Sequence, residues 1–250
     1  MLGGKLGVTL MSVMYFGILL VLYLLARLSG KWPERLRKQP KPLGAVSIAL
    51  SLANMFELYR IVNQRLAETN RAIQIFLFLS AVTSVVYFML YGVSCFKAIK
   101  YPKLLCLCPV GFHVFLLMAT FMKYTALANV GENSYDIACL CLMLVFSLQY
   151  AKMTLNYGFF KTSRSAYGVG LASALCAVLI TIPRYIIIVM DKGSALHSTL
   201  TLSMYILLYA VFQVLFLTLN LKQPVRSHDI SEEQDPGDED EYPDFSQETL

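Results

Sequence analysis

The sequence predicts an all-α membrane protein, a bundle of transmembrane helices over residues 1–222 followed by a disordered acidic tail over residues 223–250. Hydrophobic residues make up 57% of the chain and charged residues only 15%, whereas about 25% of the residues in a soluble domain are charged. A helix rises about 1.5 Å per residue, so a block of about 20 apolar residues crosses a hydrocarbon core of about 30 Å. Such blocks begin near Val8, Leu43, Ala72, Leu104, Tyr135, Tyr167 and Leu196. We therefore expect seven spans.

The first block, residues 8–28, follows a single basic residue, Lys5. It is longer than the apolar region of a typical signal peptide, and no small-residue cleavage site comes after it. We expect it to stay in the protein as a signal anchor.

The second block, residues 43–63, carries a polar ribbon. Its polar residues recur every three or four positions, so they share one face of a helix: Ser47, Ser51, Asn54, Glu57 and Arg60. A helix with this face inside the bundle explains the ribbon. A re-entrant or interfacial segment explains it too, and would leave six spans with a cytosolic N-terminus.

Glu57 needs a partner or a proton at membrane depth, because a charge at the midplane costs about 2.5–3.5 kcal/mol on insertion scales. The candidate partners are Arg60 one turn away, Lys123 and Arg184. The pair is either a structural ion pair that fixes the helix arrangement or a substrate or proton site.

The third and seventh blocks show similar polar faces at helical spacing. They comprise Ser80, Ser84, Tyr87, Tyr91 and Ser94 in the third block, and Thr201, Tyr205, Tyr209 and Gln213 in the seventh. Such side chains can bond to neighbouring helices or line a polar cavity. We expect the three faces to converge on a partly hydrated central site that includes Asn54, Glu57, Arg60, Tyr87, Tyr91, Arg184, Tyr205 and Gln213.

The fourth, fifth and sixth blocks carry fewer signals. His113 lies alone in the fourth block, where packing is the commonest role, and C-x-C pairs at Cys106 and Cys139 lack matching ligands for a metal. In the sixth block, small residues four apart predict close packing against neighbouring helices: Gly168 with Ala172, Gly170 with Ala174, and Ser173 with Ala177. Pro183 then predicts a kink before Arg184.

Loop charges predict an outside N-terminus and a cytosolic C-terminus, because basic residues favour cytosolic loops. They gather in the first, third and fifth loops and at the start of the tail: Lys31, Arg35, Arg37, Lys38, Lys41, Lys97, Lys100, Lys103, Lys152, Lys161, Arg164, Lys222 and Arg226. The second loop fits less well, since Arg60, Arg65 and Arg71 would lie at or beyond the outer boundary.

The tail holds most of the acidic residues and several prolines, a composition that cannot bury enough apolar area to fold. Tyr242 and Phe245 have the spacing of a tyrosine-based sorting signal that clathrin adaptors bind, and the terminal Leu250 could enter a PDZ groove. These features predict a place in the plasma membrane or in endosomal or lysosomal membranes.

Three functions are compatible with this sequence. The first is a carrier or channel-like protein for a small solute or lipid, the second a receptor or adaptor for other membrane proteins, and the third a lipid-modifying enzyme. The sequence has no G-x-S-x-G, H-E-x-x-H, P-loop or G-x-G-x-x-G pattern, so we predict no catalytic residue, cofactor or metal. The net charge of +5 is an average over basic loops and an acidic tail, so it is no sign of nucleic-acid binding. We expect no nucleic-acid partner. A wet cavity beside Glu57 would favour the first function, and a filled core with an apolar outer groove the second.

Overall fold

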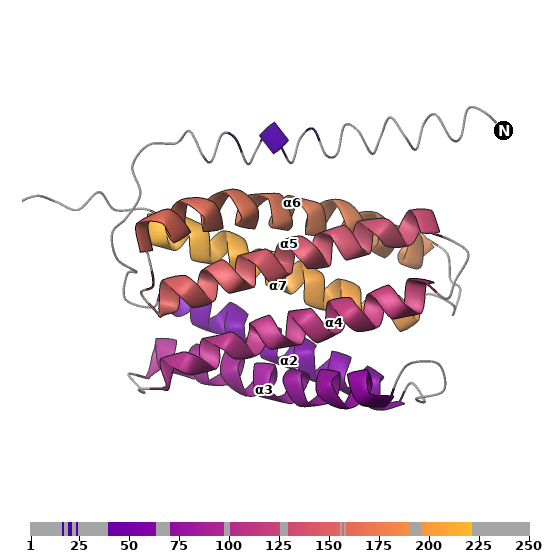
Figure 1. Ribbon diagram of the computed structural model, residues 1–250, viewed down its shortest axis with the longest axis horizontal. Helices are drawn as coiled ribbons and strands as arrows, with labels where there is room; N and C mark the ends of the chain where they lie inside the picture. Colours follow the sequence, from indigo (N-terminus) through magenta and orange to yellow (C-terminus); the bar gives the residue numbers. More distant parts are fainter. Residues whose placement is uncertain are drawn as a thin grey trace, which may run out of the picture.

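The computed structural model describes residues 17, 20, 21, 24, 40–63, 71–97, 101–125, 130–155, 157, 159–190 and 197–221. Within these residues the chain is helical throughout (Figure 1). The helices are α2 (Lys41–Asn63), α3 (Arg71–Phe96), the short 3-10 helix η1 (Lys103–Leu107), α4 (Cys108–Thr125), α5 (Val130–Thr154), α6 (Phe159–Met190) and α7 (His197–Leu221).

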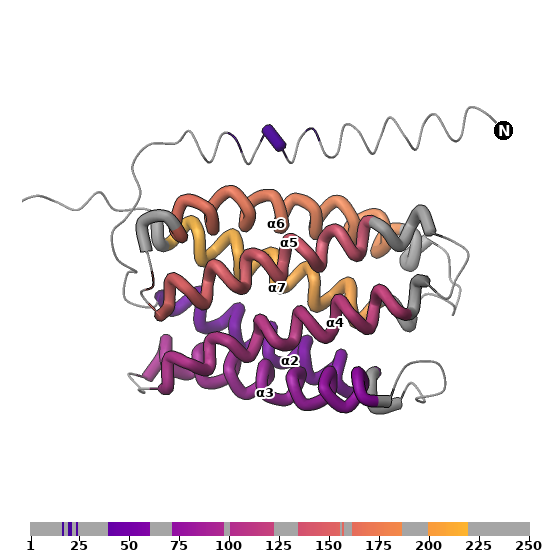
Figure 2. Tube along the Cα trace, viewed as in Figure 1, coloured from indigo at the N-terminus to yellow at the C-terminus, as the bar shows by residue number. Residues whose placement is uncertain are grey.

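The helices form a closed ring in chain order. Each helix from α2 to α6 packs against the one that follows it in the chain, and α7 packs against α2. Successive helices run in opposite directions (Figure 2). The left-hand end in Figure 1, where α2 begins and α3, α5 and α7 end, carries Lys41, Lys97 and Lys152. We call it the basic end.

Six helices in the described part of the chain are long and apolar enough to cross a membrane. The candidate spans are Lys41–Arg60, Ala72–Phe96, Lys103–Met122, Tyr135–Thr154, Thr162–Ile186 and Leu200–Leu219. The outer faces of these helices expose large apolar side chains such as Leu52, Phe76 and Ile186, as lipid contact requires. The chain is therefore built as a multi-pass helical membrane protein.

The second block is a continuous helix of 23 residues within the ring, α2, rather than a short re-entrant segment. The first predicted span, residues 8–28, falls almost wholly outside the described residues, so the seventh span stays a prediction. Helix α6 begins at Phe159, earlier than the apolar block that starts near Tyr167, and it continues through Pro183 to Met190.

Glycines bring three pairs of neighbouring helices close together. A Cβ atom on Gly92 of α3 would lie 2.6 Å from Ile48 Cγ1 and 3.0 Å from the Gly44 carbonyl oxygen of α2. A Cβ atom on Gly170 of α6 would lie 2.8 Å from both Leu217 of α7 and Phe146 of α5. The small-residue stripe predicted on α6 thus packs inside the chain, whereas the contact between Gly44 and Gly92 was not predicted.

Candidate functional site

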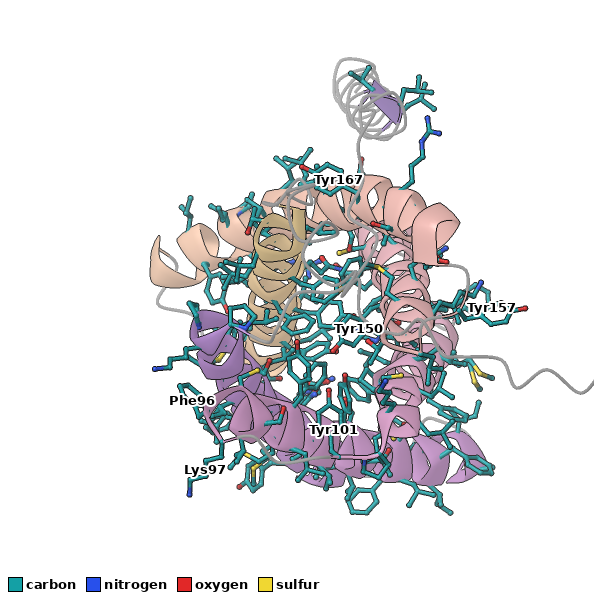
Figure 3. The ribbon with its side chains drawn as sticks, turned by 90° about the vertical axis from the view of Figure 1, so that its left-hand side faces the viewer. Phe96, Lys97, Tyr101, Tyr150, Tyr157 and Tyr167 are labelled. Carbon is teal, nitrogen blue, oxygen red and sulfur yellow. The ribbon has the colours of Figure 1, made fainter. Side chains whose placement is uncertain are left out.

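Aromatic side chains occupy the interior of the ring (Figure 3). The largest fully buried aromatic side chains come from α3, α4, α5 and α7: Tyr87, Phe88, Phe112, Phe146, Tyr205, Tyr209 and Phe212. Tyr150 lies near the middle of the ring when it is viewed from the basic end. The described interior is therefore packed with side chains. Most of its polar groups are hydroxyls and amides, and it also contains one imidazole.

The three polar faces predicted from the sequence all point inward, but they do not form one site. On α2, Ser51 Oγ donates to the Val85 carbonyl oxygen of α3 at 3.0 Å, and Asn54 Nδ2 donates to Ser84 Oγ at 3.3 Å. On α7, Gln213 Nε2 donates instead to Ser173 Oγ of α6 at 3.1 Å. The faces of α2 and α3 thus bond to each other, while Gln213 belongs to a separate contact.

Glu57 is paired with Arg60, the first of the three partners proposed for it. Arg60 Nε donates to the two carboxylate oxygens at 3.1 and 3.0 Å, and a terminal guanidinium nitrogen completes the pair. The Glu57 side chain is 0% exposed and that of Arg60 is 19% exposed. The side chain of Lys123 lies outside the described residues.

Arg184, the third candidate partner of Glu57, is paired with Asp136 instead. A terminal nitrogen of Arg184 lies 2.8 Å from each carboxylate oxygen of Asp136, whose side chain is 2% exposed. The reason is the order of the ring: α6 is a neighbour of α5, which carries Asp136, and α2 packs against α3 and α7. Sequence analysis passed over Asp136, although a single carboxylate near the start of an apolar block is a signal that could have been used.

His113 is more than a packing residue. It is fully buried near the middle of the span Lys103–Met122, with Nδ1 2.7 Å from the Pro109 carbonyl oxygen and Nε2 2.9 Å from the Tyr205 hydroxyl. A carbonyl oxygen can only accept, so the hydrogen is on Nδ1 and Nε2 accepts the proton of Tyr205. The Tyr209 ring lies 4.7 Å from the imidazole between centroids. The sequence placed both tyrosines on one polar face, but it gave His113 only a packing role, because nothing local links it to that face.

A tyrosine cluster lies nearer the basic end. The hydroxyls of Tyr87 and Tyr150 are 2.6 Å apart. The Tyr91 ring packs against both, and the Tyr101 ring packs against those of Tyr87 and Tyr91. Tyr87 and Tyr91 were predicted site residues. Tyr150 and Tyr101 were not, because neither belongs to a repeated polar face in the sequence. The chain of rings from Tyr209 through Phe212 to Tyr150 joins this cluster to His113, with centroids 6.0 and 5.7 Å apart.

The cysteine pairs do not form metal sites in the described part of the chain, where no group of three or more His, Cys, Asp or Glu side chains is placed to bind an ion. Cys139 is buried and Cys141 is exposed, so the two residues of this C-x-C pair point in different directions. Tyr242 and Phe245 lie outside the described residues.

No protein-family model, no curated protein and no solved structure matches this chain. Its class therefore rests on its own geometry, which is that of a multi-pass helical membrane protein with buried polar groups inside a closed ring.

Proposed function

We propose that the protein is a non-enzymatic carrier or channel-like protein for a small solute. The observation that supports this best is the hydrogen bond between His113 and Tyr205, which lies deep in the membrane-spanning part of the ring, together with the buried carboxylate of Glu57 on α2. Ionisable side chains within transmembrane segments are costly, and they commonly mark substrate, ion or proton pathways. An all-apolar interior would hold six helices together without that cost.

The packed interior limits the size of the solute. Large aromatic rings fill the ring between α3 and α7, so a lipid could not pass without a wide separation of helices. A small solute needs only side-chain movements or a small opening of the ring. The lipid substrate considered from the sequence is therefore less compatible with this interior than a small solute.

A receptor or membrane adaptor is the second candidate, and the filled core favours it, because a wet cavity beside Glu57 was the expectation for a carrier. In that case the interior polar groups serve only to hold the helices together, and water does not reach them. Accessibility of the interior to water therefore separates the two candidates.

We would test this with single cysteines on α2, introduced into a variant that lacks the six native cysteines. Ser51 is buried inside the ring, whereas its neighbour Leu52 is 51% exposed on the lipid-facing side. A carrier or channel predicts that a membrane-impermeant thiol reagent modifies Ser51→Cys faster than Leu52→Cys in intact membranes. Equal protection of both cysteines would refute a solute pathway and favour the adaptor.

The cellular setting is part of the proposal. We place the protein in the plasma membrane or in endosomal or lysosomal membranes, with clathrin adaptors or a PDZ protein as partners of a cytosolic tail. Protease protection of a tag after Leu250 tests the side of the C-terminus, and a second tag before Met1 separates seven spans from six. Tags on opposite sides agree with seven spans, and tags on one side with six.

A further inference from the structure

We propose that the basic end of the ring binds the chain's own acidic tail, residues 223–250. The basic end presents lysines on several neighbouring elements, and the tail supplies carboxylates that the described part of this end lacks. The proposal goes beyond the proposed function, because it concerns an outer surface and needs no solute pathway through the interior.

Two exposed lysines lie where α2 begins and α3 ends. Lys41 is the first residue of α2, and Lys97 directly follows α3. The two helix ends pack closely, since a Cβ atom on Gly44 would lie 2.6 Å from Cys95 Cβ. Both lysines are exposed, and Lys97 points away from the ring in the view from the basic end (Figure 3). They form one side of a positively charged surface.

The 3-10 helix η1 continues this surface toward α5. Lys103 begins η1 and is exposed, and Leu104 beside it is 68% exposed. The Cys106 thiol donates to the Ala151 carbonyl oxygen at 3.7 Å, which holds η1 against α5 next to the half-buried Lys152. The surface therefore combines lysines from four elements with an exposed apolar side chain.

No carboxylate lies beside these lysines in the described part of the chain. The acidic residues in the described ranges are Glu57, Glu132 and Asp136. Glu57 lies near the end of α2 and the other two near the start of α5, so all three lie toward the opposite end of the ring. Glu57 and Asp136 are moreover paired with arginines. The basic end thus has a charge that an acidic segment can complement.

The tail is attached at the basic end and is long enough to cross it. Helix α7 ends there at Leu221, so the tail leaves the ring on the side of the lysines, whichever way the protein crosses the membrane. Seven of the ten residues 232–241 are acidic. Neighbouring helix axes lie about 8–10 Å apart, so opposite helices of a six-membered ring are about 20 Å apart. Residues 222–231 span up to about 33 Å when extended, so they can carry the acidic run across this end.

Attachment to the chain favours the tail over an anionic lipid headgroup as the occupant. A segment on a short linker is present at an effective concentration of the order of millimolar. Its carboxylates can contact lysines of α2, α3 and η1 together, whereas one headgroup contacts few of them. Tyr242 and Phe245, which follow the acidic run, also offer aromatic rings to the exposed Leu104. The contact should weaken with salt, because exposed charges are screened beyond about 8 Å at physiological ionic strength.

The test measures how fast a glutamate-specific protease cleaves the tail of the full chain in phosphatidylcholine nanodiscs. Cleavage follows the population of released tail when release is fast. The triple variant Lys41→Gln/Lys97→Gln/Lys103→Gln leaves the cleaved segment unchanged. We expect its tail to be cleaved about tenfold faster than that of wild type, as the loss of several exposed ion pairs implies. High salt should raise the wild-type rate to that of the variant.

Lys123→Gln is the matched control, because Lys123 lies in the last turn of α4, at the opposite end of the ring. Its cleavage rate should equal that of wild type, and the melting temperature of the triple variant should show that it remains folded. Equal rates for wild type and the triple variant at low salt would overturn the proposal, as would a wild-type rate that does not rise with salt. Phosphatidylserine retained by purified wild type but not by the triple variant would then make an anionic headgroup the occupant of this surface.

Discussion

Replacing Arg184 by Leu should destabilise the protein more than replacing Asp136 by Leu does. The two side chains form an ion pair between α5 and α6, but they are not equally buried: the Asp136 side chain is 2% exposed and that of Arg184 is 23% exposed. Removal of Arg184 deprives a buried carboxylate of its cation, which costs about 3–5 kcal/mol for a buried pair. Removal of Asp136 leaves a guanidinium on a long side chain that can move toward water, so we expect a loss of about 0.2–1 kcal/mol, as for a partly exposed pair.

The double variant Asp136→Leu with Arg184→Leu provides the decisive comparison. It leaves no uncompensated charge, so its cost should be smaller than that of Arg184→Leu alone. The assay is unfolding in mixed micelles with increasing fractions of a denaturing detergent, followed by circular dichroism. Equal losses in the two single variants, or a double variant whose loss is the sum of the single losses, would show that the pair is not the buried contact described here.

Three other predictions follow from the packing, the second ion pair and the tail. Gly92→Ala should destabilise the protein by about 1–3 kcal/mol in the same assay, because its Cβ would overlap Ile48 across α2 and α3; Gly111→Ala, where a Cβ meets nothing within 4 Å, should not. Glu57→Leu should lower the yield of membrane-inserted protein, because it leaves the Arg60 guanidinium without its carboxylate at membrane depth, whereas Glu57→Gln should be tolerated. Equal yields of the two variants would show that Glu57 does not contribute to stability. Tyr242→Ala and Phe245→Ala should each raise the surface fraction in a biotinylation assay, and wild-type levels in both would show that the tail carries no sorting signal.

Periodicity in the sequence predicted which faces of the helices are buried. Ser47, Ser51 and Asn54 recur at helical spacing, and all three lie inside the ring. Spacing suffices here because a helix places residues three or four apart on one face, whatever it packs against. The lengths of the apolar blocks likewise predicted helices long enough to span a membrane, and six of them are present in the described residues.

Contacts between side chains on different helices could not be predicted in the same way. The contacts between His113 and Tyr205 and between Asp136 and Arg184 depend on which helices are neighbours and on how far one is shifted along the other. No local pattern contains this information. The close contact between Gly44 and Gly92 has the same origin, because two isolated glycines form a site only when α2 and α3 meet at that level.

The two ion pairs differ in what they hold together, and this bears on the role of Glu57. Asp136 and Arg184 join two helices, so their pair can fix the arrangement of α5 against α6. Glu57 and Arg60 are three residues apart on one helix, so their pair neutralises charge without joining α2 to a neighbour. The pair between Glu57 and Arg60 therefore does not by itself fix α2 against a neighbouring helix. We accordingly expect Glu57→Gln to leave the detergent midpoint of unfolding unchanged; a lowered midpoint would return Glu57 to a structural role.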